Sequence, residues 1–295
     1  MLIEKKEDIV GDSGQLRIGE TPLLRLNRTG DPSRPIFVKL ENANPSGSIR
    51  DRYIQEIVEK GLRAGQIQRG DTLVLAGIDD SAVSAAYLAG IHGLSAAVFA
   101  PASSSKRLVE VIEGHARVFW TDDAEGLEGA VQKAAAYARD SVERIYVDGY
   151  RRQAVKDAYA ALAQEIVTDL GETVLGGFVT SVTTGATFRE VSRLLRARQP
   201  QLEVRGVRLV ENEFATAEEN PFIRQASMDD VWRVRDQVFE KEGLLLGPKG
   251  AACVLECLQL QAEIPEGRAV VALNPDSGSR YNGWEDQKLF RAKFG

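Results

Sequence analysis

Short apolar runs rich in β-branched residues alternate with longer helical patterns along most of the chain, and this alternation limits the fold more than any other feature. The runs that predict strands are Pro35–Leu40, Thr72–Leu75, Ala96–Ala100, Ala116–Trp120, Gly177–Val182, Val204–Val210 and Ala269–Asn274. The stretches that predict helices are Arg52–Ala64, Ser81–His92, Lys106–Glu113, Glu125–Ser141, Ala154–Leu170, Phe188–Arg198, Asp229–Glu242 and Gly250–Ala262. Such alternation is typical of α/β proteins with a largely parallel sheet.

Several junctions share one form, in which an apolar strand is followed by a small-residue loop and then by a helix start. The junctions run from Val74 to Ser84, from Val179 to Ser192 and from Leu245 to Val254. Loops of this kind direct backbone N–H groups and a helix dipole toward the carboxyl edge of the sheet, where open α/β folds bind ligands. Because any strand-to-helix turn needs small residues, the pattern alone leaves the ligand open.

Composition and charge exclude several classes of partner. Of the 295 residues, 43% are hydrophobic and 27% are charged, and the formal net charge is −6 with both signs scattered along the chain. A non-specific nucleic-acid or acidic-membrane partner is therefore not expected. No apolar run approaches the roughly 20 residues that cross a bilayer. The first twelve residues lack the apolar core of a signal peptide, so a cytoplasmic setting is expected.

The two cysteines do not predict a metal site. Cys253 and Cys257 are spaced to share one helix face, but no histidine or further cysteine lies near them in the sequence. A metal site needs more ligands than two thiols. We therefore expect both cysteines to pack a helix against the core, and no metal ligands are predicted.

The segment Lys39–Arg52, KLENANPSGSIRDR, is the motif that carries the most information. The strand ends at Leu40, Asn44 and Pro45 favour a turn, and Gly47 relieves the steric limits on the backbone. Ser48 then predicts a cap for a helix that begins near Ile49. This arrangement presents the side chain of residue 50 at a helix N-terminus, although a capped loop with no further role explains the pattern equally well.

The same segment resembles the signature of cysteine synthases, in which a lysine occupies the position of Arg50. Further segments resemble family segments in the same order: GETPLLRL (Gly19–Leu26), FVTSVTTGATFREVSR (Phe178–Arg193), EGLLLGPKGAA (Glu242–Ala252) and PDSGSRY (Pro275–Tyr281). The chain thus resembles the cysteine synthase (O-acetylserine sulfhydrylase) and cystathionine beta-synthase-like family, within the fold type II enzymes that depend on pyridoxal phosphate (PLP).

The resemblance implies a fold and an assembly. The expected fold is α/β and tryptophan-synthase-beta-like, with two three-layer α/β domains and a cleft between them. Residues 1–40 plus 149–295 are expected to form the larger domain, and residues 41–148 the smaller one. The resemblance also implies a homodimer, with a small-molecule or peptide ligand in the interdomain cleft and a protein partner as a further expectation.

Arg50 argues against the chemistry that the resemblance implies. The family's lysine forms a Schiff base with PLP and then moves a proton, which requires a neutral amine. The guanidinium of arginine stays protonated because its pKa is above about 12, and it forms no comparable imine. No cofactor is therefore expected, and PLP would bind at best non-covalently. Lys249 is the better candidate for a relocated Schiff-base lysine, although an exposed lysine at a helix start is the more usual interpretation. Lys39 is less favoured, because its counterpart in relatives belongs to the scaffold.

The substrate loop also departs from the family pattern. Residues 77–82, GIDDSA, stand where relatives carry Thr-Ser-Gly-Asn-Thr-Gly, so Asp79, Asp80 and Ser81 occupy the position that holds the substrate carboxylate. Two acids at that position are expected to repel a carboxylate. Simple N-capping of the following helix explains them equally well.

Part of the phosphate-binding segment is kept. The residues that form an expected anion-binding remnant are Thr183, Thr184, Gly185 and Thr187. Ser277 stands where the family places a serine against the pyridine nitrogen, but by itself it is better explained as a hydrogen-bonding loop residue. Gly149 stands near a family glutamine that it cannot replace, and the stretch from Glu211 to Asp229 is shorter than the family's covering segment.

These departures favour a pseudoenzyme that keeps the fold for binding or regulation. The alternative is an enzyme with altered chemistry that acts on an amino-acid-like substrate, either without PLP through a charged cluster of Asp79, Asp80 and Arg50, or through Lys249. A conventional sulfhydrylase is the least favoured hypothesis, because the lysine is missing.

Overall fold

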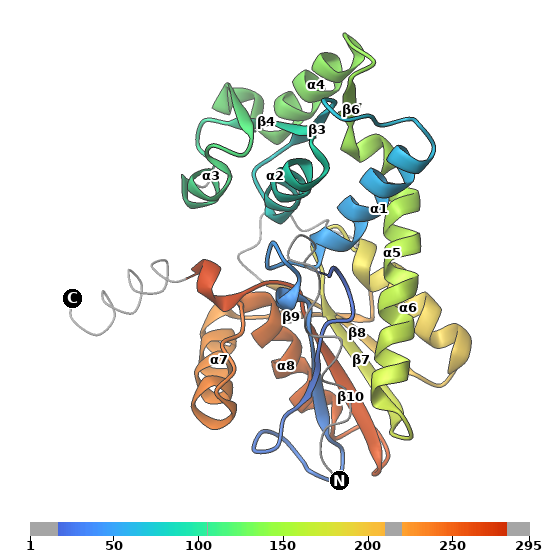
Figure 1. The fold of residues 1–295 in the computed structure, drawn as a ribbon. Helices are drawn as coiled ribbons and strands as arrows, with labels where there is room; N and C mark the ends of the chain where they lie inside the picture. Colours follow the sequence, from blue (N-terminus) through green and yellow to red (C-terminus); the bar gives the residue numbers. More distant parts are fainter. Residues whose placement is uncertain (1–16, 105, 210–219, 282–295) are drawn as a thin grey trace, which may run out of the picture.

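The computed structural model describes residues 17–104, 106–209 and 220–281, which form two β-sheets covered by helices (Figure 1). The strands are β1 (Leu23–Arg25), β2 (Ile36–Leu40), β3 (Thr72–Ala76), β4 (Ser95–Pro101), β5 (Arg117–Thr121), β6 (Arg144–Tyr146), β7 (Val174–Ser181), β8 (Glu203–Leu209), β9 (Ile223–Ala226) and β10 (Arg268–Asn274). The helices are α1 (Arg50–Arg63), α2 (Asp80–His92), α3 (Lys106–Ile112), α4 (Gly126–Arg139), α5 (Val147–Leu170), α6 (Ala186–Arg198), α7 (Met228–Glu242) and α8 (Pro248–Leu260). Short 3₁₀ turns lie at Glu41–Ala43, Asp123–Glu125 and Gly278–Tyr281.

The larger sheet has the strand order β1-β2-β10-β7-β8-β9, and all neighbours are parallel except β1 and β2. Its central strand β10 is buried on both faces, as expected for an apolar run in a parallel sheet. Alternate residues of β10 point to opposite faces. Val271 and Leu273 pack with α5 and α6, whereas Val270 and Ala272 pack with α7 and α8. This sheet is therefore the middle of three layers.

The smaller sheet has the order β5-β4-β3-β6, with every pair parallel. Leu73 and Leu75 of β3 join the apolar cluster of α1 and α2, while Val74 packs with the alanines of α4. The predicted α/β architecture with two three-layer parts is confirmed. The proposed boundaries of the parts, at residues 40/41 and 148/149, remain a prediction.

The differences from the predicted elements have local reasons. The short strands β1, β6 and β9 were not predicted, because three or four residues give too little periodicity to recognise. Helix α5 begins at Val147 and not at Ala154, since polar residues in its first two turns hide the apolar pattern. Residue 210, the predicted end of one strand, lies outside the described residues.

The topology brings three helix starts to one place. Strands β2, β7 and β10 run parallel, so their carboxyl ends meet at one edge of the larger sheet. Helices α1, α6 and α8 begin at this edge, and α2 begins at the carboxyl end of β3 in the smaller sheet. Figure 1 shows α1 and α5 packed side by side where the two parts meet. In the described ranges, no helix has the length and apolar character that spanning a membrane requires.

Candidate functional site

The loop after β2 places Arg50 at the first residue of α1. Gly47 has a positive φ of 82°, which an L side chain rarely adopts, and the Arg280 guanidinium lies 3.3 Å from where a Cβ would stand. The Ser48 hydroxyl accepts a hydrogen bond from the Arg50 N–H at 3.1 Å. The N-cap residue itself is Ile49, which has no side-chain cap bond, so Ser48 acts one position earlier than predicted.

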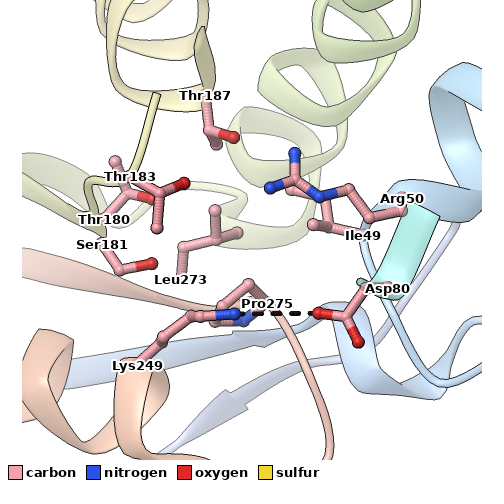
Figure 2. Close-up of a pocket in the computed structure, with 10 residues that line it drawn as sticks. All are labelled: Ile49, Arg50, Asp80, Thr180, Ser181, Thr183, Thr187, Lys249, Leu273 and Pro275. Carbon is pink, nitrogen blue, oxygen red and sulfur yellow. Dashed lines mark ion pairs between the residues drawn. The ribbon is translucent and has the colours of Figure 1, made fainter. Parts of the chain in front are cut away.

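Arg50 and Lys249 face a common small cavity of about 20 Å³ (Figure 2). The cavity is lined by Ile49, Arg50, Asp80, Thr180, Ser181, Thr183, Thr187, Lys249, Leu273 and Pro275. Figure 2 shows the two cationic side chains reaching toward it from α1 and α8. A cavity of this size holds about one water molecule. A larger ligand therefore enters only if the walls move apart.

The wall formed by the end of β7 and the start of α6 keeps the character of an anion site. Thr183 and Thr187 line the cavity, whereas Thr184 is exposed outside it, and a role of these residues in anion binding stays a prediction. Gly185 is the N-cap of α6, with a φ of 76° and no side-chain cap bond. The first N–H groups of α6 are thus not taken up by a capping side chain, and the helix dipole favours an anion.

The Arg50 guanidinium stays charged in this cavity. Burial opposes its charge, but the neighbouring Tyr159, Tyr53 and Asp79 outweigh that effect and raise its pKa. The Tyr159 hydroxyl beside Arg50 accepts a hydrogen bond from Thr187 at 3.3 Å. Within the described part of the chain, no carboxylate forms an ion pair with Arg50. The guanidinium is therefore available to pair with an anion across from the start of α6.

Lys249 is charged as well, for a different reason. Its ammonium lies 2.8 Å from Asp276 and 3.7 Å from Asp80. Burial opposes its charge, but Asp276 outweighs that effect and raises the pKa of Lys249. A lysine that forms a covalent bond to a carbonyl carbon must first lose its proton. The contact with Asp276 works against this step.

The acidic residues of the substrate-loop position have separate tasks. Asp79 caps α2: its Oδ1 accepts hydrogen bonds from the Ser81 N–H at 2.8 Å and the Ala82 N–H at 3.4 Å. Asp80 points the other way, toward Arg280 and Lys249. The expected cluster of Asp79, Asp80 and Arg50 is thus not formed by direct ion pairs. Ser81 is buried and lies outside the residues that line the cavity.

The remaining predicted residues lie at the margins. The Ser277 hydroxyl lies 2.8 Å from that of Ser279 and does not line the cavity. Position 149 lies within α5, away from the cavity lining. Residues 211–219 of the shortened covering segment lie outside the described residues.

Five polar residues of the site and its surroundings were not predicted from the sequence. Thr180 and Ser181 line the cavity, Tyr159 neighbours Arg50, and Asp276 and Arg280 pair with Lys249 and Asp80, respectively. Four of the five fall in segments that resemble the family. Asp276 and Arg280 lie within three residues of Ser277 in the sequence, and these two charged residues were the signal that could have indicated the ion pairs. Tyr159 gave no signal, because an aromatic residue in a helix usually packs in the core.

Comparisons with known proteins identify the family. Residues 15–227 match the family described as "Pyridoxal-phosphate dependent enzyme", and the chain belongs to this family. The "Cysteine synthase" of Helicobacter pylori (strain ATCC 700392 / 26695) is 27% identical over 291 residues, covering 90% of this chain and 94% of that protein. "Cysteine synthase B" of Pseudomonas aeruginosa is 27% identical over 281 residues, with 90% and 93% covered.

Solved structures agree. The O-acetylserine dependent cystathionine beta-synthase from Helicobacter pylori has a TM-score of 0.78 at 26% identity, with 90% of this chain and 95% of that chain covered. O-ureido-L-serine synthase has a TM-score of 0.83 at 21% identity, with 94% of each chain covered, and shows the shared fold. The chain is thus a fold type II protein of the cysteine synthase and cystathionine beta-synthase-like group.

The prediction that the chain uses no cofactor is wrong. Both the matched family and the cysteine synthase relatives point to PLP. The prediction equated the loss of a covalent anchor with the loss of the cofactor. The phosphate of PLP is an anion that binds independently of that anchor, and the hydroxyls and free N–H groups at the start of α6 suit it. The donor groups at the start of α6 thus suit a phosphate, but the cavity of about 20 Å³ has to widen to admit one, and position 50 supplies no amine.

Proposed function

We propose that this cysteine-synthase-like chain holds PLP without a covalent bond at position 50 and does not perform the family's β-replacement reaction. The observation that carries the proposal is the charged Arg50 guanidinium, which faces the cavity where a neutral amine would be needed. When bound, PLP supplies an electron sink that stabilises a carbanion. The function left to this chain is then binding or regulation.

The roles of the individual residues support this proposal. Thr183, Thr187 and the first N–H groups of α6 would hold the phosphate. Arg50 contributes a fixed positive charge beside the Tyr159 hydroxyl. A guanidinium that stays protonated cannot take up a proton from a substrate carbon. The chain therefore keeps groups that bind and orient, but it lacks a base at this position.

A second candidate function is altered chemistry on an amino-acid-like substrate through Lys249. The supporting observation is that Lys249 lines the same cavity as Arg50. Its contact with Asp276 disfavours the neutral amine, so this candidate requires the contact to break first. The two candidates differ in whether Lys249 ever forms a covalent adduct.

We further propose a cytoplasmic homodimer with a small-molecule or peptide ligand in the cleft. Its support is the match to the relatives over about nine-tenths of the chain. Light scattering on the purified protein should give twice the mass of 32.3 kDa. A monomer at all concentrations would contradict the dimer.

The experiment is a PLP titration followed by borohydride reduction and peptide mapping, on the wild-type protein and on Arg50→Lys. We expect the wild type to shift the PLP spectrum and to release all PLP on dialysis, with no reduced adduct. Arg50→Lys is expected to gain an adduct at position 50, because the phosphate contacts are retained. Neither protein is expected to form cysteine from O-acetylserine and sulfide, since residues 77–82 no longer suit a substrate carboxylate.

Three results would contradict the proposal. An adduct at Lys249 in the wild type, lost in Lys249→Met, would establish the altered-chemistry candidate. Sulfide-dependent cysteine formation by the wild type would restore the conventional enzyme. Absence of PLP binding by both proteins would contradict the proposed phosphate site. Thr187→Val tests separately whether the Thr187 hydroxyl contributes to PLP binding.

A further inference from the structure

The Asp80 carboxylate bridges the two parts of the molecule. It comes from the first turn of α2, beside the smaller sheet, and pairs directly with the Arg280 guanidinium. It also lies 3.7 Å from the Lys249 ammonium, at the start of α8 beside the larger sheet. The second arm of Arg280 donates a hydrogen bond to the Ser46 carbonyl, in the loop that leads to α1. These contacts tie the loop at residues 275–281 to α2 and to the start of α1.

Helix capping does not account for the position of Asp80. Asp79 already caps α2 through two backbone N–H groups. The Asp80 side chain is only 15% exposed and lies among cations from distant segments. Its neighbour Asp79 therefore offers a matched acid that has the helix role without a direct ion pair to Arg280 or Lys249.

The two cations need a carboxylate partner. Arg280 is 15% exposed, and Asp80 is the one carboxylate, among the described residues, that pairs with it directly. Asp51 and Asp79 act on Arg280 only through their charges. Lys249 lies at a helix N-terminus, where the dipole disfavours a cation, and Asp276 holds it there. Asp276 also accepts a hydrogen bond from Tyr281 at 2.9 Å.

We propose that Arg280 and Lys249 form a carboxylate-binding site, which Asp80 fills from within the chain and for which a ligand carboxylate competes. This inference rests on the proposed function, because Asp80 and Lys249 line the same cavity as Arg50. A carboxylate that displaces Asp80 frees α2 from residues 275–281. The walls of the cavity of about 20 Å³ can then separate, so ligand entry and opening are coupled.

The internal carboxylate sets the affinity for an external one. A tethered group competes at an effective concentration in the millimolar range or above. Simple carboxylates therefore bind the wild-type protein weakly. A buried charged group without its partner is strongly unfavourable. Removal of Asp80 leaves Arg280 in this state, so an external anion that binds there should stabilise the protein.

The test is chemical rescue of Asp80→Ala with acetate, read as thermal unfolding of the full chain without PLP. We expect Asp80→Ala to melt below the wild type and to recover by several degrees as acetate is added, with saturation in the millimolar range. The wild type should respond at least about tenfold more weakly, because Asp80 competes with acetate. Calorimetric titration of acetate gives the same affinity independently.

Two matched controls isolate the site. Asp79→Ala removes the adjacent acid and the α2 cap but leaves Asp80 on Arg280, so acetate should not rescue it. Acetamide has the size of acetate without its charge and should not rescue Asp80→Ala. Arg280→Gln in the Asp80→Ala background should abolish the acetate response, since the main cation is gone.

Equal acetate effects in Asp80→Ala and Asp79→Ala, or no effect in Asp80→Ala, would overturn the inference. If Asp80→Ala does not fold, Asp80→Asn replaces it in the test, because asparagine keeps the side-chain volume of aspartate. The inference would then be overturned if Asp80→Asn bound acetate no more tightly than the wild type does. These measurements use no PLP. If the protein does not bind PLP, the acetate experiment still tests the carboxylate site. If acetate does not rescue Asp80→Ala, the PLP titration still tests the proposed function.

Discussion

At the residue scale, the platform that carries Arg50 depends on a buried ionic network. Lys39 is completely buried, and its ammonium donates to the Thr21 carbonyl at 2.6 Å and pairs with Asp169 at 2.8 Å and Glu165 at 2.9 Å. Arg52 pairs with the same Glu165 at 2.7 Å and with a buried glutamate of the 3₁₀ turn. Glu165 thus links β2 and α1 to α5, and removal of one member leaves a buried charge unpaired.

Glu165 makes the stability of the fold depend on acid pH. Burial opposes its ionisation, but the hydrogen bonds and charge of Arg52 outweigh that effect and lower its pKa from 4.5 to about 2. The stabilisation is fully present above pH 4.5 and is lost as the pH falls toward 2. We expect this group to account for up to about 3 kcal/mol of the loss in unfolding free energy. Denaturant titrations across this range measure it.

The comparison is between Glu165→Gln and the exposed Glu240→Gln on α7. Glu165→Gln should be less stable than wild type at pH 7 and should lose this part of the acid dependence. Glu240→Gln should follow the wild-type curve. Parallel curves for wild type and Glu165→Gln would show that Glu165 does not carry the effect.

At the element scale, close packing of α8 on β10 positions Lys249. Gly250 lies in the first turn of α8, and a Cβ built on it would stand 1.9 Å from the Asn274 Oδ1. Asn274 is completely buried at the end of β10 and donates to Asn42 at 2.8 Å. The missing side chain thus lets the start of α8 approach the strand end and the cavity.

Gly250→Ala should therefore destabilise the protein, although alanine favours helices. We expect a loss of about 1–3 kcal/mol in unfolding free energy from overpacking. The matched control is Gly90→Ala in α2, where a Cβ meets nothing within 4 Å. That change should stabilise by about 0.5–1 kcal/mol. Denaturant unfolding of both variants checks the signs, and a neutral Gly250→Ala would contradict the packing argument.

At the scale of the whole molecule, one apolar core joins the two sheets while ion pairs close the cavity between them. Leu73 of the smaller sheet and Val271 of the larger one belong to the same cluster of buried residues, with α1 and α5 between them. At the cavity, the two parts are also held together by the ion pairs of Asp80 with Arg280 and Lys249. Apolar packing thus supplies a permanent joint, and the ionic contacts supply one that a competing anion can break.

The two cysteines report on the unfolding of the larger part. Cys253 and Cys257 lie on α8 and are completely buried, as predicted for packing residues, and burial raises the pKa of both thiols. Because the chain has no other cysteine, a thiol reagent should label the native protein only through unfolding. We expect both thiols to react rapidly in denaturant, and the labelling rate without denaturant to be at least about a hundredfold lower. Fast labelling of the native protein would contradict this burial.

The sequence by itself determined the longer helices and strands, the largely parallel α/β plan and the chemistry that Arg50 cannot perform. Periodicity and turn residues are local, and a guanidinium stays charged in any surroundings. Only the tertiary structure decided what the other charges do. Asp80 and Arg280 are separated by 200 residues, so their pairing depends on how the two parts pack. The same packing sets Asp276 against Lys249 and keeps this lysine charged.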